Sequence, residues 1–207
     1  MRSLKHFFEQ SWLLIVASFF FGLLIAATNA ALSPRIEMNK VTKLTSLARG
    51  LLPQAEKFAP LRERIEIQGS DGKQQEVAVY KALADDSTVG WTFKAVGSGF
   101  ADKIELVVAV DEAFETLAGF DVLMSNETPG FGDQIKASFF RDQFAGAPAA
   151  GLSLVNTGNT EEIDDKIVAI SGATVSSTAV VETINHYLAQ VKEQLQKKGL
   201  IGNGSES

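Results

Sequence analysis

The stretch IVAISGATVSST (residues 167–178) decides the fold of the C-terminal half of the chain. Its first four residues, 167–170, are β-branched or otherwise apolar, as in a buried strand. The small and hydroxyl residues that follow are typical of a turn at the start of a helix. From about Ser176 to Lys198, apolar side chains recur at helical spacing. We therefore expect a strand that enters the last helix through a small-residue turn.

The turn at 171–178 has the chemistry of an anion site. The first N–H groups of a helix have no acceptor inside the helix, and the helix dipole places positive charge at the same end. Gly172 and Ala173 would let a ligand approach the backbone closely. The hydroxyl groups around them could hydrogen-bond an anion, or one of them could be esterified to it: Ser171, Thr174, Ser176 and Ser177.

Helix capping is the alternative interpretation of the same hydroxyl groups. A Ser or Thr side chain just before an apolar helical repeat most often accepts a hydrogen bond from the N-terminus of the helix. Ser176, Ser177 or Thr178 could fill this role. The residues of the turn alone leave capping and anion binding both open.

Upstream of the turn, the sequence predicts a series of short strands. Five stretches alternate in polarity or are rich in β-branched residues: 64–67, 76–83, 88–96, 103–110 and 118–124. Clusters of Gly, Ser and Asp separate the earlier ones, and such short turns favour antiparallel hairpins. We predict a β-meander, then a turn-rich loop at 126–133, a short helix at 136–144 and two short strands at 152–155 and 167–170.

The N-terminal part is predicted to be a membrane anchor. Residues 10–34 contain no charged residue, and the mostly apolar residues 12–32 are enough for a helix to cross a hydrocarbon core of about 30 Å. A cleaved signal peptide is the alternative, since Thr28-Asn29-Ala30 resembles a cleavage site. Lysine and arginine flank the stretch on both sides, so their distribution does not orient it. Residues 33–60 are expected to form a helical stalk.

Composition excludes several classes of function. The net charge of −6 argues against a nucleic-acid partner, because binding phosphates requires a basic face. The chain has no cysteine, which excludes disulfides, thiol chemistry and iron–sulfur ligation by thiolates. Its two histidines, His6 and His186, lie at opposite ends of the sequence and indicate no metal site. Any redox function must therefore use an organic cofactor.

Three features together resemble a known family. They are the SGAT turn (171–174), the ETPGFG loop (127–132) about 45 residues earlier, and the N-terminal anchor. In this order, with the strand pattern between them, they resemble the G subunit of the Rnf electron-transport complex. The C subunit of the sodium-translocating NADH:quinone reductase shares the same domain but is usually longer. The resemblance covers essentially the whole chain.

The resemblance implies an α+β FMN-binding domain at 61–198, with an antiparallel sheet and flanking helices, followed by a disordered tail at 199–207. It also implies that FMN is joined covalently to Thr174 through a phosphoester, which a separate flavin transferase makes. Further contacts to the cofactor are expected from the turn and from the earlier loop: Ser171, Gly172, Ala173, Ser176, Ser177, Glu127, Thr128 and Gly130.

Two of these features can be interpreted in more than one way, and one position departs from the family pattern. Gly99 and Phe100 could form part of the site, since an aromatic ring beside glycines can pack on a flavin ring, or they could belong to a simple hairpin turn. The loop 127–132 could be only a Pro-Gly turn that closes the sheet. Relatives often have an acid three residues before Ser171, whereas this chain has Val168.

In function, the resemblance implies a single-pass subunit of the bacterial inner membrane, with its anchor in lipid and its domain outside the cytoplasm. It would pass electrons between other subunits of an ion-translocating ferredoxin:NAD oxidoreductase complex. We expect no catalysis by the chain alone, since it has no G-x-G-x-x-G fingerprint for NAD. Two other functions stay open: an anchored scaffold subunit in which 171–177 only caps a helix, and an enzyme that acts on phosphate esters.

Overall fold

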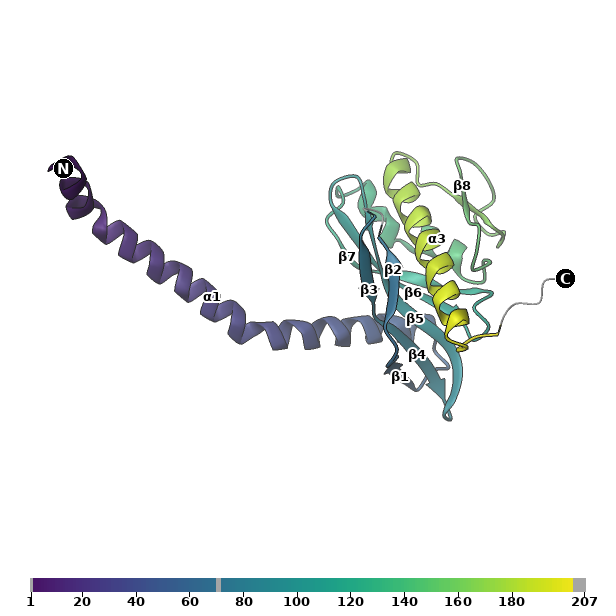
Figure 1. Cartoon of the computed structure of the whole chain (residues 1–207). Coiled ribbons are helices and arrows are strands. Elements are labelled where there is room, and N and C mark those ends of the chain that lie inside the picture. Colours follow the sequence, from purple (N-terminus) through teal and green to yellow (C-terminus); the bar gives the residue numbers. More distant parts are fainter. Residues whose placement is uncertain (1, 70–71, 203–207) are drawn as a thin grey trace. The chain divides into compact units, whose positions relative to one another are not determined.

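A computed structural model describes residues 2–69 and 72–202 of the chain (Figure 1). The chain forms two compact units, one up to Thr42 and the other from Lys43 onward. The elements follow one another in this order: α1 (Arg2–Leu51), β1 (Lys57–Pro60), β2 (Ile65–Gln68), β3 (Gln74–Val77), β4 (Val79–Ala84), β5 (Ser87–Ser98), β6 (Lys103–Asp111), β7 (Leu117–Ser125), η1 (Gly132–Lys136), α2 (Ser138–Arg141), η2 (Asp142–Phe144), β8 (Ser153–Val155), β9 (Lys166–Val168) and α3 (Thr174–Lys197).

The first unit consists of the N-terminal part of α1. This helix is continuous, with Pro34 inside it, and it is long and apolar enough to cross a membrane, reaching a mean hydropathy of 2.1. Its large apolar side chains are exposed, among them Phe19, Phe20 and Phe21. Such a surface suits a lipid environment, because a helix that is apolar all round is stable only when it is surrounded by apolar material.

The second unit contains a five-stranded antiparallel sheet in the order β1-β4-β5-β6-β7. Strands β4 to β7 follow one another as hairpins, with Trp91 opposite Val110 in the β5–β6 pair. The predicted meander is therefore confirmed. The single strand expected at 76–83 is in fact two, because the chain leaves the β2–β3 hairpin at Val77 and enters the main sheet at Val79. The last two strands, β8 and β9, pair in parallel.

Helices cover both faces of the five-stranded sheet. α3 lies across one face, where its residue Ile184 shares the main core with Phe93 and Val108 (Figure 1). The last turns of α1 cover the other face, where Leu44 and Ala48 pack with residues from three strands: Tyr80, Val107 and Leu123. Both faces are therefore buried, which explains why β6 is apolar at successive positions instead of alternating in polarity.

The expected stalk at 33–60 is wrong for its second half. From Lys43 onward α1 belongs to the domain, and residues 57–60 form strand β1 at the edge of the sheet. The apolar stripe that includes Leu44 and Leu51 packs on the sheet. The same stripe would suit a free-standing helix that contacts another protein, so periodicity alone does not distinguish the two cases.

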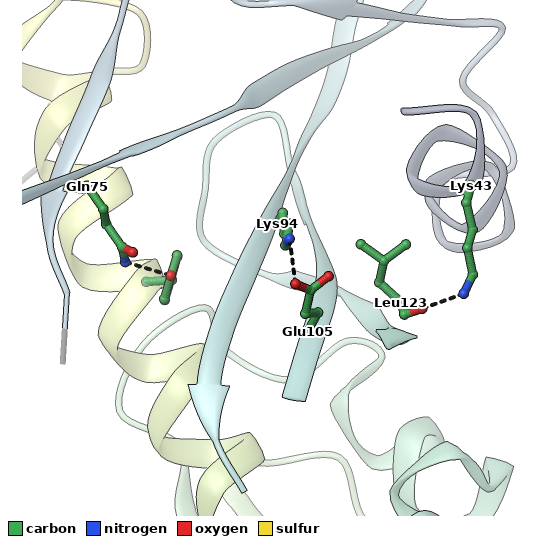
Figure 2. Close-up of polar contacts among 6 residues, drawn as sticks. Lys43, Gln75, Lys94, Glu105 and Leu123 are labelled. Atoms are coloured by element: carbon green, nitrogen blue, oxygen red, sulfur yellow. Dashed lines mark hydrogen bonds and ion pairs between the residues drawn. The ribbon is translucent and has the colours of Figure 1, made fainter. Parts of the chain in front are cut away.

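Polar contacts link the elements around the sheet. Three of them are drawn in Figure 2: Lys43 Nζ of α1 donates to the carbonyl oxygen of Leu123 in β7, Lys94 Nζ pairs with Glu105 Oε1 across β5 and β6 at 2.8 Å, and Gln75 Nε2 of β3 donates to the hydroxyl group of Tyr187 in α3 at 2.7 Å. The last contact fixes the β2–β3 hairpin on α3.

The helix expected at 136–144 is replaced by three short helical turns, η1, α2 and η2. Phe140 and Phe144 are fully buried there and meet Phe120 of β7 edge to face, with ring centroids 6.3 and 4.6 Å from it. The bends between the turns bring both rings onto the sheet. This aromatic packing outweighs the modest gain from one continuous short helix.

α3 ends in a glycine cap. Gly199 has φ +68°, and the N–H of Leu200 donates to the carbonyl oxygen of Leu195 at 2.9 Å, which closes the last turn. Ile201 is buried against the core. The disordered tail expected from residue 199 is therefore wrong for 199–202, and residues 203–207 lie outside the described residues.

Candidate functional site

The loop and the turn singled out in the sequence meet in one pocket of about 430 Å³. It lies between the β5–β6 hairpin, the loop after β7 and the start of α3. A volume of this size is ordinary for a small-ligand site. The lining consists of Phe100, Glu127, Thr128, Phe131, Gly132, Gly172, Ala173, Thr174, Val175 and Ser176.

The start of α3 forms one wall of the pocket. The helix begins at Thr174, and its N-cap is Ala173, whose side chain has no polar atom. No side chain among the described residues caps it, so the capping alternative is wrong: Ser176 and Ser177 lie inside the first turn. The N–H groups of 174–176 therefore have no acceptor within the helix, and these residues line the pocket. The helix start keeps its anion-binding groups available.

Ser177 holds the turn together instead of facing the pocket. Its Oγ donates to the carbonyl oxygen of Ala173 at 3.0 Å and accepts from the N–H of Ile170 at 3.1 Å, and the residue is fully buried. Gly172, with φ +76°, provides the left-handed bend between these two partners. Ser177 thus has a structural role in place of the expected cofactor contact.

Glu127 is the one residue of the pocket lining with an ionisable side chain, and it is 4% exposed. Its Oε2 accepts from the Ser176 hydroxyl group at 2.5 Å, and its Oε1 accepts from the N–H groups of Ala101 at 3.0 Å and Asp102 at 3.5 Å. The carboxylate therefore joins the β5–β6 hairpin to the first turn of α3. A buried charge needs such partners, because an unpaired one would be strongly destabilising.

Opposing effects set the pKa of Glu127. Burial acts to raise it, but the hydrogen bonds from Ser176 and from the backbone of the Phe100–Asp102 turn outweigh burial and lower the pKa below its ordinary value of 4.5. The side chain is therefore ionised in the folded protein at neutral pH.

This lowered pKa predicts how stability depends on pH. The carboxylate contributes stability above about pH 4.5, and this contribution is lost as the pH falls through the lower pKa of the folded state. The Glu127→Gln variant has no carboxylate at this position and therefore lacks this contribution at every pH. The difference in free energy of unfolding between wild type and variant should therefore shrink on acidification. Urea unfolding at about pH 6 and pH 3.5 measures this; a difference that stays constant with pH would contradict it.

Two glycines make room for the Glu127 side chain. A Cβ atom built on Gly99 would lie 2.3 Å from Glu127 Oε1 and 2.9 Å from the carbonyl oxygen of Asp102. A Cβ atom on Gly132 would lie 2.7 Å from Glu127 Oε2 and 2.7 Å from Ser176 Oγ. Neither position can accept a larger residue without moving the carboxylate or the backbone beside it.

Seven of the eleven residues predicted from the sequence line the pocket together. The other four lie outside the lining. Gly99 packs behind Glu127, Ser177 stabilises the turn, Ser171 is exposed, and Gly130 takes φ +78° in a turn where its carbonyl oxygen accepts from Gln134. The seven are Phe100, Glu127, Thr128, Gly172, Ala173, Thr174 and Ser176.

Three lining residues were missed: Phe131, Gly132 and Val175. Phe131 carried the same signal as Phe100, an aromatic ring beside glycine, and could have been found by the same reasoning. Gly132 and Val175 are brought to the pocket by the fold of the loop and by the register of α3. Both lie within the loop and the turn that the sequence singled out, but neither residue type by itself indicates a ligand contact.

The pocket residues suit both ends of FMN, the flat flavin ring and the phosphate. Phe100 and Phe131 are large apolar side chains, 70% and 57% exposed at the pocket, and offer surfaces for a flat aromatic ring. The start of α3 offers N–H groups for a phosphate. The lining contains no histidine, lysine or arginine.

Comparison with known proteins agrees with this geometry. Residues 99–189 match the FMN-binding domain family. The chain is 31% identical, over 93% of its length and 95% of the relative, to the G subunit of the Na⁺-translocating ferredoxin:NAD⁺ oxidoreductase complex of Acetobacterium woodii. It is 29% identical, over 87% of its length and 92% of the relative, to the G subunit of the ion-translocating oxidoreductase complex of Methanosarcina acetivorans.

Solved structures support the fold. NqrC of Shewanella oneidensis superposes with a TM-score of 0.56 at 22% identity, over 70% of this chain and 73% of that one. A likeness at this identity concerns the fold alone, so the family rests on the sequence identities. Because these extend over nearly the whole length, the chain belongs to the family of G subunits of ion-translocating oxidoreductase complexes of the Rnf type and carries an FMN-binding domain.

Proposed function

We propose that this chain carries FMN joined covalently to Thr174 and acts as an electron-transfer subunit of an ion-translocating ferredoxin:NAD oxidoreductase complex. A flavin transferase would make the phosphoester bond from FAD: the Thr174 hydroxyl group displaces AMP from the flavin phosphate, which breaks the pyrophosphate bond, and the hydroxyl proton is released. The other subunits of the complex would deliver and accept the electrons. The named functions of the relatives support the complex, and the pocket geometry supports the attachment point.

The observation that carries the attachment point is the position of Thr174. It is the first residue of α3, it is exposed, and it lines the pocket beside the free N–H groups of the first helical turn. A phosphate on its Oγ would start at the positive end of the helix. Of the other two pocket-facing hydroxyl residues, Ser176 donates to Glu127, and Thr128 lies on the opposite loop.

The other pocket residues would hold and shield the cofactor. Bound FMN supplies the electron-transfer chemistry. Phe100 and Phe131 would cover its ring and exclude water, and Thr128 would offer a hydroxyl group to its polar edge. The N–H groups of 174–176 would bind the phosphate. The chain thus binds and orients the flavin.

The apolar part of α1 would keep this domain at the membrane. We place the domain outside the cytoplasm. A covalent bond suits this location, since a flavin lost there could not readily be replaced.

Expression with and without the flavin transferase tests the proposal. The full chain made with the transferase should fluoresce under ultraviolet light in a denaturing gel, because only a covalent flavin survives denaturation. The chain made without it should not. A dark band in both cases, with the transferase active on another substrate, would contradict covalent FMN and favour the scaffold function.

Val168 provides a test of recognition by the transferase. Its side chain lies in β9 and is half-buried, and its backbone N–H donates to Gln143 Oε1 at 2.8 Å. If the acid that relatives often have at this position helps the transferase, Val168→Asp should raise flavin occupancy when the transferase is limiting. Val168→Asn is the control, because asparagine has nearly the same shape as aspartate but carries no charge. Equal occupancy in wild type and Val168→Asp would show that the acid is not needed.

A further inference from the structure

The Glu127 carboxylate lies beside the positive end of α3. Its Oε2 accepts from the hydroxyl group of Ser176, two residues after Thr174 in the first turn, and Glu127 and Thr174 line the same pocket. The N-terminus of a helix carries about half a positive charge. Part of this field therefore already acts on an anion of the protein itself before any ligand is bound.

The position of this charge is fixed. Glu127 has hydrogen-bond donors on both carboxylate oxygens, from Ser176 on one side and from Ala101 and Asp102 on the other. Gly99 and Gly132 pack so closely against it that a Cβ atom on either would overlap its oxygens. The side chain is therefore held in place at the pocket by its hydrogen bonds and by the close packing of these two glycines.

A fixed anion next to a phosphate site distinguishes phosphates by their charge. The phosphate monoester of free FMN carries between about −1.5 and −2 charges at neutral pH, since its second pKa is about 6. The diester formed on Thr174 carries one. Repulsion by Glu127 is therefore greater for free FMN than for the attached cofactor.

We propose that Glu127 is a specificity-determining positioning residue, which makes this pocket favour the singly charged phosphodiester on Thr174 over the phosphate of free FMN. The inference rests on the proposed function, because it places the flavin phosphate at the start of α3. Its consequence is that the unmodified pocket retains free FMN poorly. The site then stays open until the flavin is attached.

Equilibrium dialysis of the unmodified full chain tests the inference. The protein is made in a host without the transferase, kept in detergent, and dialysed against FMN or against riboflavin, which has the same ring and side chain but no phosphate. Glu127→Gln removes the charge and keeps an acceptor for the Ala101 N–H. We expect it to raise the affinity for FMN relative to riboflavin by about fivefold.

Glu105→Gln is the matched control. It removes the same charge from β6, where Glu105 pairs with Lys94 at 2.8 Å (Figure 2), and Glu105 does not line the pocket. It should leave the ratio of FMN to riboflavin affinity unchanged. If Glu127→Gln fails to give a folded domain by circular dichroism, Glu127→Ala is measured instead, because it makes the same change in charge.

Three results would overturn the inference. In the first, the ratio of FMN to riboflavin affinity is the same in the Glu127 variant as in wild type. In the second, the affinities for both flavins change equally, which indicates a purely structural role. In the third, neither wild type nor variant retains either flavin. Covalent attachment is measured separately by mass. It would stand or fall independently of these results.

Discussion

Thr174→Ala should abolish covalent FMN while leaving a folded domain. The variant has no hydroxyl group at position 174, so no phosphoester can form there. Its stability should change by less than about 0.5 kcal/mol, because Thr174 is exposed and alanine is a good helix former. Intact mass gives the occupancy, and circular dichroism gives the fold.

Thr178→Ala is the matched control for this result. Thr178 lies one turn further along α3, where its Oγ1 donates to the carbonyl oxygen of Thr174 at 2.9 Å, and it does not line the pocket. We expect full occupancy in this variant. Full occupancy in Thr174→Ala as well would mean that the flavin is attached elsewhere.

Gly99→Ala should have the largest effect on stability and should also disturb the pocket. The new methyl group would overlap Glu127 Oε1 and the backbone oxygen of Asp102, and the latter cannot move by a change of rotamer. Overpacking of this kind costs roughly 2 to 3 kcal/mol. Urea unfolding should report this loss, and flavin occupancy should fall because the carboxylate that joins the hairpin to α3 is displaced.

Gly50→Ala is the control for a glycine without close neighbours. Apart from its chain neighbours and the backbone of its own helix, no atom lies within 4 Å of a Cβ built on Gly50, which is near the end of α1. The substitution should be neutral, or should stabilise by up to about 1 kcal/mol through helix propensity. If Gly99→Ala is as well tolerated as Gly50→Ala, the packing described around Glu127 is wrong.

The sheet could be predicted from the sequence because its signals are local. Turn clusters such as 85–87 separate β-branched stretches, and each hairpin forms between neighbours in the chain. The second helical layer could not be predicted in the same way. Leu44 and Leu51 form an apolar stripe, but nothing in the stripe says whether it packs on this sheet or on another protein.

The site could not be predicted from local sequence patterns alone. The contact between Glu127 and Ser176 joins residues 49 positions apart, and on the sequence side only the family resemblance predicts that the two segments meet. The apolar periodicity places the start of α3 two residues too late. Each residue turns a helix by about 100°, so a shift of two residues changes the positions assigned to the side chains near its start. With a start at Ser176, the side chains of Ser176 and Ser177 look like caps, whereas in the structure both are buried within the first turn.

Peptide mapping of the chain from its own host tests the central claim most directly. Cleavage after Lys166 and Lys192 gives one peptide, residues 167–192, that contains Thr174 together with every other hydroxyl residue of the turn. Fragmentation by mass spectrometry should place one esterified FMN on Thr174. A peptide without added mass, or with the flavin on Ser171, Ser176 or Ser177, would contradict the assignment.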